Sequence, residues 1–323
     1  MHDILSPALA PGLGAKSGAS SRIHLASAVD RRYLLPLAVL LESIRRTQAP
    51  GEEMVLHLLH RSLLPEDLRR LGTLVNLNPI HVGAEHAQRC VLDATLPAEA
   101  AFPLLLAELI PREVEKVLFL DADLMALTDL RPLWELPLGD QVLLAAQDAA
   151  VPLCSSRRGV KRWRDLGIPK DTKYFNGGVM LIDLVQWRAR SISRQVEAYL
   201  QRNFGQLEFV HQEVLNAILW DQRRIIDARW NLPGSLAGRS VAKSGSARAQ
   251  DPGIVHFAGR MKPWRFPVGG PFYPRYQQIM GAVTPLFPPT KASWGERMKS
   301  LYDRFGRGLL YPLERLLWQH RWL

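Results

Sequence analysis

The sequence predicts an α/β fold in which a mixed, mostly parallel sheet is flanked by helices. Strand-like runs alternate along the chain with longer runs in which apolar residues recur at helical spacing. Two strand-like runs, residues 142–146 and 178–182, are continuously apolar, as strands covered by helices on both faces are. With 323 residues, 47% of them hydrophobic, the chain can bury a sizeable core.

The elements are expected in an order that supports this fold class. Helical spacing is clearest in residues 33–46, and Pro65 gives a helix-start signal for residues 65–75. Residues 234–253, rich in Gly, Ser, Ala and Arg, predict a long flexible surface loop. Further strands are expected at residues 22–28, 54–59 and 117–120, and further helices at 103–110 and 210–219.

Composition narrows the class of protein. Cys90 and Cys154 are the only cysteines, so neither a disulfide framework nor a zinc cluster is expected, and a reducing compartment is favoured. No window reaches the roughly 18 apolar residues that cross a bilayer. The net charge of +10 fits nucleic acid, an anionic membrane or a phosphorylated substrate. The sequence has no zinc-finger spacing, RNA-recognition signature or basic zipper, which argues against nucleic acid.

The run LFLDADLMAL, residues 118–127, places Asp121 and Asp123 directly after a buried strand. On a straight strand both carboxylates would point to one face, where they are costly to bury unpaired. A hard divalent cation shared with substrate phosphates would compensate them, and ligands bind beyond the carboxyl ends of such strands. The alternative is an Asp-rich turn that caps the following segment.

Three later segments also concentrate polar residues beside apolar runs: YFNGGVMLIDL at 174–184, VHQEVLNAIL at 210–219 and IVHFAGRMKPW at 254–264. In the first, consecutive glycines permit close approach of a ligand to the backbone. Together with KVLFLDADL and the N-terminal HLASAVDRRYLLPLAVLLESI, these motifs resemble glycosyltransferase family 8, in the same order along the chain. This retaining group uses nucleotide sugars and has the GT-A fold.

The resemblance implies a metal site. Asp121, Asp123 and His256 match the family's ligands, which hold Mn²⁺ on the diphosphate of a UDP-sugar. Mixed oxygen and imidazole ligation suits Mn²⁺ better than Mg²⁺, although Mg²⁺ is also possible. A lone histidine would more often be a core or surface residue, and the surrounding motif is what singles out His256.

The resemblance also implies donor-binding residues. Lys262 and the backbone of Gly259 would meet the diphosphate, and Ala122 lies between the two metal-binding carboxylates. Ala28 and Asp30 match positions that contact uridine, with Asp30 placed to accept a hydrogen bond from the uracil N–H. For Lys262 the alternative is a solvated surface lysine.

The catalytic residues that the resemblance implies are Asp148, Asn176, His211 and Gln212. Asp148 and Asn176 match positions that contact the transferred sugar, and Gln212 matches the residue under its reacting carbon. Retaining glycosidases usually place a carboxylate nucleophile about 5 Å from a second acid. Because an amide occupies that position here, a front-face route, in which the departing diphosphate helps to deprotonate the acceptor, fits better than double displacement.

Three positions depart from the family pattern. Phe102 and Pro103 stand where a Tyr-x-Arg-type stretch is usual, so one donor-side cation is missing. His211 replaces a carboxylate of the Asp-Gln-Asp motif by an imidazole that can donate or accept. Arg32 replaces a small polar residue beside the uridine. These departures weaken any assignment of the sugar and leave reduced activity as an alternative.

Three parts of the chain are expected: a flexible N-terminal segment (residues 1–21), a catalytic domain (22–288) and a basic amphipathic tail (289–323). The N-terminal segment has neither a basic n-region nor a long apolar run, so no signal peptide or anchor is expected. The tail mixes Trp, Tyr and Leu with Lys and Arg, which is typical of an anionic membrane interface. A helix packed on the catalytic domain or on a partner subunit is the alternative.

The expected function is transfer of a hexose, galactose or glucose, from UDP to a glycan or glycolipid such as a lipopolysaccharide core. The expected location is the cytoplasm, at the inner face of the plasma membrane. A nucleotidyltransferase would also use paired Asp residues and a divalent ion. A nucleotide-sugar-binding protein with weak or no transferase activity is the non-enzyme alternative.

Overall fold

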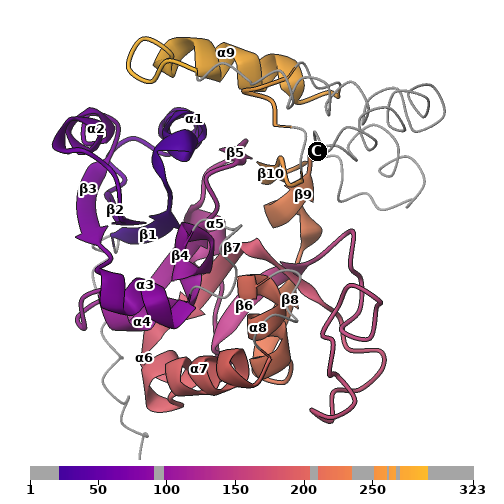
Figure 1. Ribbon diagram of the computed structural model, residues 1–323. Helices are drawn as coiled ribbons and strands as arrows, with labels where there is room; N and C mark the ends of the chain where they lie inside the picture. The colour runs from indigo at the N-terminus through magenta and orange to yellow at the C-terminus, as the bar shows by residue number, and fades with distance from the viewer. Residues whose placement is uncertain are drawn as a thin grey trace, which may run out of the picture.

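The computed structural model describes residues 22–90, 98–203, 210–234, 251–259, 262–266 and 270–289. The predicted N-terminal segment and nearly all of the predicted tail lie outside these residues, as does most of the loop predicted at 234–253. Figure 1 shows helices on both sides of a central twisted sheet. Among the described residues there is no helix with the length and apolar character that a membrane crossing needs.

Seven strands form the central sheet in the order β3-β2-β1-β4-β7-β6-β8. Pairing is parallel except on the two sides of β7, so the sheet is mixed and mostly parallel, as predicted. A second sheet has the order β5-β10-β9. The strands are β1 (Ile23–Ala28), β2 (Met54–His60), β3 (Asn76–His81), β4 (Lys116–Leu120), β5 (Leu124–Ala126), β6 (Leu143–Gln147), β7 (Phe175–Asp183), β8 (Arg223–Ile226), β9 (Leu232–Pro233) and β10 (Ile254–His256).

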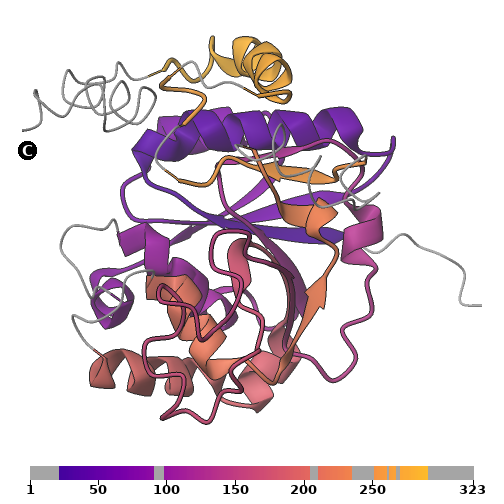
Figure 2. The same cartoon turned by 90° about the vertical axis from the view of Figure 1, so that its right-hand side faces the viewer.

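Helices pack against both faces of the sheet (Figure 2) and enclose two apolar clusters. One cluster joins the sheet to η2, α4, α6, α7 and α8, and the other joins it to α1, α9 and the second sheet. The helices are η1 (Arg31–Tyr33), α1 (Leu34–Thr47), α2 (Pro65–Leu71), α3 (Ala84–Cys90), η2 (Ala98–Leu105), α4 (Leu106–Leu109), α5 (Arg131–Trp134), α6 (Leu184–Ala189), α7 (Ile192–Arg202), α8 (Val210–Ile218), η3 (Ala228–Asn231) and α9 (Tyr273–Val283).

The reversed direction of β7 gathers polar residues at one edge of the sheet. Strands β4 and β6 are both antiparallel to β7, so the start of β7 lies beside their ends. Asp121 follows β4, Asp148 follows β6, and Asn176 is the second residue of β7. Three segments far apart in sequence therefore contribute to one edge, where α/β proteins bind their ligands.

The structure corrects several expected elements. The helix predicted at residues 65–75 ends at Leu71, directly before Gly72. The helix predicted at 103–110 is a 3-10 helix, η2, followed by the single turn α4; Pro103 has no N–H for an α-helical bond. Strand β3 was not predicted, because its residues are exposed or half-buried and include Pro79. The strand lies at the edge of the central sheet, where proline is tolerated.

Candidate active site

Asp121 and Asp123 lie where the chain leaves the central sheet and enters the second one. Residues 121–123 connect β4 to β5 through a turn rather than along a straight strand. The N–H of Asp121 donates to the carbonyl of Gly178 (2.8 Å), and the carbonyl of Asp123 accepts from the N–H of Phe257 (2.9 Å). Asp121 and Asp123 therefore lie in and beside a turn that is hydrogen-bonded to two distant segments.

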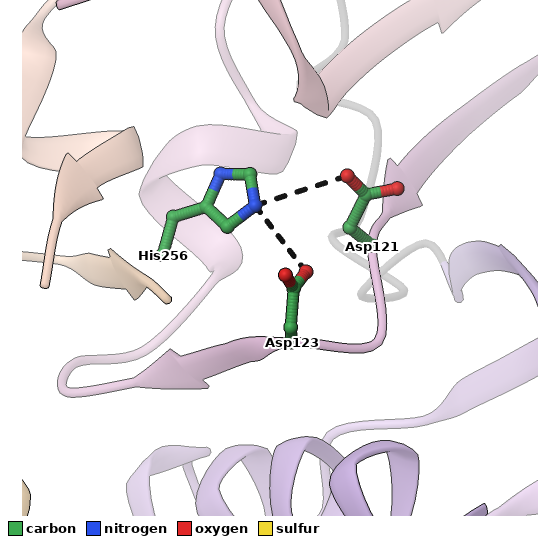
Figure 3. Close-up of side chains that lie close together, drawn as sticks. All are labelled: Asp121, Asp123 and His256. Carbon is green, nitrogen blue, oxygen red and sulfur yellow. Dashed lines mark ion pairs between the residues drawn. The ribbon is translucent and has the colours of Figure 1, made fainter. Parts of the chain in front are cut away.

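His256 faces both carboxylates. It ends β10, which pairs with β5 so that His256 lies opposite Leu124. Its Nε2 is 3.2 Å from Asp123 Oδ1 and 3.8 Å from Asp121 Oδ2 (Figure 3). One ligand atom from each of the three residues lies within 4.8 Å of the others. Two carboxylate oxygens and an imidazole nitrogen form a donor set that fits a divalent ion such as Mn²⁺.

Gly178 makes room for this convergence. A Cβ at this position would lie 2.4 Å from His256 Cε1, 2.8 Å from its Nδ1 and 3.0 Å from Asp121 Oδ2. The imidazole and the carboxylate thus meet over a glycine backbone that no larger residue could provide. The close approach expected at the Asn-Gly-Gly motif is made by protein side chains.

Lys262 adds a positive charge to the two carboxylates. Its Nζ is 2.5 Å from Asp123 Oδ2 and 3.0 Å from the carbonyl of Phe257. Desolvation disfavours the charged form of Asp123, but Lys262 and His256 outweigh it and lower the pKa of Asp123. Desolvation, together with the charge of Asp123, raises the pKa of Asp121 to about 7. Asp123 is thus paired with Lys262 and His256, whereas the charge of Asp121 is less well balanced by nearby cations.

Asn231 orients the imidazole of His256. Its side-chain oxygen lies 2.9 Å from His256 Nδ1, which leaves Nε2 directed at the carboxylates. The amide group of Asn231 donates to Asn176 Oδ1, also at 2.9 Å. Asn231, in η3, was not predicted, because a single Asn between Trp230 and Leu232 gives no sequence signal. Asn231 therefore links the candidate metal ligands Asp121, Asp123 and His256 to Asn176, which is predicted to contact the sugar.

The residues predicted to contact the sugar form one hydrogen-bonded group. Asn176 and Gln212 both donate to Asp148 Oδ2, at 2.8 and 3.0 Å. The Oε1 of Gln212 accepts from the N–H of Gly177 at 3.0 Å. Both ends of the Gln212 amide are therefore held by the protein, in a fixed orientation.

Hydrogen bonds from within the protein fill the acceptor positions of the Asp148 carboxylate. Its Oδ1 accepts from the N–H groups of Ala150 and Val151, each at 2.8 Å, and its side chain is buried. A carboxylate has about four acceptor positions, and the protein fills all four. In this arrangement Asp148 positions Asn176 and Gln212.

His211 lies against Gly177 and is in its neutral form. Burial lowers the pKa of His211 to about 4, opposed only in part by a hydrogen bond to the backbone of Ala100. A Cβ on Gly177 would be 3.0 Å from its Nε2, so the ring packs directly on that glycine. The imidazole that replaces a family carboxylate is therefore uncharged near neutral pH.

A cavity connects these groups with the predicted nucleoside residues. Its wall includes Ala28, Asp30, Asp121, Ala122 and Asp123, and it extends to His211. Pro103, which stands where the family has a donor-side cation, also lines it, as do Tyr33, Glu99 and Ala100, to which the sequence assigned no site role. Asp30 caps η1, and its carboxylate accepts from the N–H and the Nε of Arg32 at 2.8 and 2.7 Å.

Gly259 differs from the other predicted residues. It lies three residues after His256, is exposed and has a positive φ of 91°. A Cβ there would meet no atom within 4 Å, so the glycine meets a backbone requirement rather than a packing one. It forms a bend three residues after the end of β10.

Comparison with known proteins identifies the family. The family model described as "Glycosyl transferase family 8" matches residues 24–267. General stress protein A of Bacillus subtilis (strain 168) is 26% identical over 276 residues, which cover 80% of this chain and 93% of that protein. Probable galacturonosyltransferase-like 8 of Arabidopsis thaliana is 26% identical over 265 residues, covering 76% of this chain and 67% of that protein.

Solved structures share the fold. A galactosyltransferase LgtC in complex with donor and acceptor sugar analogues superposes with a TM-score of 0.68 at 23% identity, covering 86% of this chain and all of that one. The WbbM bifunctional glycosyltransferase also reaches 0.68, at 18% identity, covering 86% of this chain and 53% of that one. These likenesses confirm the predicted GT-A fold. The chain belongs to glycosyl transferase family 8 and is an enzyme of the hexosyltransferase type, as its sequence motifs predict.

Proposed function

We propose that this enzyme is a retaining, Mn²⁺-dependent transferase that moves galactose or glucose from a UDP-sugar to a glycan or glycolipid acceptor. The observation that carries the proposal is the convergence of Asp121, Asp123 and His256 on the wall of a cavity that also holds Asp30. A cation on these ligands would neutralise the donor diphosphate and stabilise the charge that develops on the leaving group.

Lys262 would contribute to donor binding once the cation occupies the carboxylates. Its ammonium group now lies against Asp123, at the position where a metal ion would compete for the same oxygen. If a cation displaced the ammonium group of Lys262 from Asp123, its hydrogen bond to the carbonyl of Phe257 would hold it beside the diphosphate. A fixed cation in a partly dry cleft stabilises growing negative charge more than it would in water.

The sugar-binding group supports retention without a protein nucleophile. The nearest carboxylate to Gln212 in its hydrogen-bonded group, Asp148, has all its acceptor positions filled. Gln212 presents an amide, which is a poor nucleophile, held through Gly177 and Asp148. A front-face transfer, with the diphosphate oxygen taking the acceptor proton, fits these residues better than a covalent sugar intermediate.

An anionic acceptor surface, such as a lipopolysaccharide core or the inner face of the plasma membrane, is part of the proposal. The predicted membrane-binding tail lies outside the described residues, but a second basic segment does not. Residues 149–173 carry seven Lys and Arg and two Asp, a net charge of +5 that is half the formal charge of the chain. This segment joins Asp148 to β7 and is held by an antiparallel bridge between Leu153 and Lys173.

Vesicle sedimentation tests this surface. Replacing Arg157, Arg164, Lys170 and Lys173 together by Gln should weaken binding to phosphatidylglycerol vesicles by about 100-fold or more, since each cation near the surface contributes about 1 kcal/mol. The matched control replaces four other exposed arginines by Gln: Arg61, Arg194, Arg202 and Arg275. Equal losses in both variants would refute a specific role for residues 149–173. A chain truncated after Pro289 that no longer sediments would assign binding to the tail.

A panel of UDP-sugars tests the reaction. Incubation with Mn²⁺ should release UDP from one of them, and Asp123→Ala should abolish both this release and metal-dependent UDP binding. Unchanged calorimetric affinity of that variant would refute the site assignment. In a parallel incubation with UTP and a hexose 1-phosphate, release of pyrophosphate would indicate a nucleotidyltransferase. Binding of UDP-hexose without hydrolysis or transfer to any acceptor would indicate a nucleotide-sugar-binding protein.

A further inference from the structure

Glu99 is a largely buried carboxylate in the cavity wall that also holds Asp30 and Asp121. It lies in η2 and is 9% exposed. Among the described residues, no hydrogen bond or ion pair involves its side chain. A carboxylate withdrawn from bulk water in this way is costly unless a ligand supplies donors.

The surroundings of Glu99 place it at the nucleoside end of the cavity. The pKa of Arg32 is raised, chiefly by its hydrogen bond to Asp30 and to a smaller extent by the charge of Glu99. Glu99 and Asp30 both line this cavity, and Asp30 matches a uridine-contacting position. The guanidinium of Arg32 is already bonded to Asp30, so it does not neutralise Glu99 by direct contact.

The described residues that line this cavity include no Lys or Arg. The neighbouring cavity residues Ala100 and Pro103 are uncharged, and His211 is neutral. Pro103 stands where the family resemblance would place an arginine. The negative charge of Glu99 therefore faces the space that the donor would fill. A diphosphate would be repelled there, whereas a group with O–H or N–H donors would be bound.

We propose that Glu99 is a nucleoside-recognition residue, whose carboxylate accepts hydrogen bonds from O–H or N–H groups of the donor nucleoside. The proposal rests on the proposed function, because it assumes a nucleotide donor in this cavity. A nucleoside offers two sources of such donors, the ribose hydroxyls and the N–H of the base. Either would satisfy the buried carboxylate, and a vicinal diol could occupy both of its oxygens at once.

Calorimetry with UMP tests the proposal without the diphosphate and its metal. Glu99→Gln preserves the shape of the side chain but removes its charge, and should weaken UMP binding by about 10- to 100-fold, the range for a charge-assisted hydrogen bond. Glu85→Gln, at an exposed position in α3, makes the same charge change outside the cavity and should leave the affinity unaltered. Unchanged UMP affinity in a folded Glu99→Gln variant would overturn the proposal.

Nucleotide analogues identify the group that Glu99 binds. The 2′-deoxy, 3′-deoxy and N3-methyl forms of UMP each remove one donor. An analogue that lacks a partner of Glu99 should bind the unaltered enzyme more weakly and lose less affinity on Glu99→Gln, while the others keep the full loss. If Glu99→Gln weakens the binding of UMP and of every analogue by the same factor, none of the removed donors is bonded to Glu99 and the proposal fails.

Two further measurements separate this proposal from the proposed function. If the unaltered enzyme binds neither UMP nor UDP with Mn²⁺, the proposed function fails first. If it binds both and Glu99→Gln binds them equally well, only the role of Glu99 fails. Glu99→Asp keeps the charge but withdraws the carboxylate by one methylene. It should also weaken UMP binding, and it provides the test if the Gln variant does not fold.

Discussion

Gly178→Ala should disable the metal-binding group while leaving each of its ligands in the chain. The added Cβ would lie 2.4 Å from His256 Cε1, whereas carbon atoms pack at about 3.5 Å. The imidazole must therefore retreat by about 1 Å, and Asp121 Oδ2, which would lie 3.0 Å from the added Cβ, is also crowded. Disturbing the groups that orient metal ligands commonly costs 10- to 100-fold in affinity, and we expect a loss of at least about that size for Mn²⁺.

The assay is titration of Mn²⁺, followed by electron paramagnetic resonance of the free ion, with and without UDP. Gly281→Ala is the matched control. Gly281 lies in α9 with no atom within 4 Å of an added Cβ, so this variant should bind Mn²⁺ normally and gain about 0.5–1 kcal/mol of stability. A folded Gly178→Ala variant with unchanged Mn²⁺ affinity would refute the reasoning that the glycine permits His256 and Asp121 to meet.

Three further outcomes follow from the same structure. Asn231→Ala should lower Mn²⁺ affinity by about 10- to 100-fold in the same titration, because His256 loses its orienting partner; an unchanged affinity would contradict that role. Phe102→Ala should cost about 3–5 kcal/mol in urea unfolding, since the ring is fully buried, and a loss below about 1 kcal/mol would contradict this packing. Burial, then the charge of His24, lowers the pKa of His57 to about 4. The unfolded chain thus binds the proton first, so stability is complete above about pH 6.5 and falls towards pH 4, by at most about 3 kcal/mol. Urea unfolding at pH 7 and 4.5 should show a smaller loss for His57→Gln than for the unaltered protein.

Much of the site could be recognised in the sequence because its residues stand in short motifs. Asp121 and Asp123 follow an apolar run of four residues, and His256 and Lys262 share one segment. The structure brings this group together, and it unites Asp148, Asn176 and Gln212 in a second group. Asn231 and Glu99 could not be recognised in this way. Asn231 is singled out by its hydrogen bond to His256, and Glu99 by its burial in the cavity wall. Burial and hydrogen bonding are properties of the folded chain.

The α/β class, the family and the candidate metal ligands could be recognised in the sequence alone, because apolar periodicity and clustered polar motifs are local properties. How those motifs meet depends on the fold. The reversal of β7 places Asn176 and Gly178 beside the end of β4, and the second sheet carries His256 back to Asp123. Distance between segments far apart in sequence depends on strand order and direction. No local pattern specifies either of these.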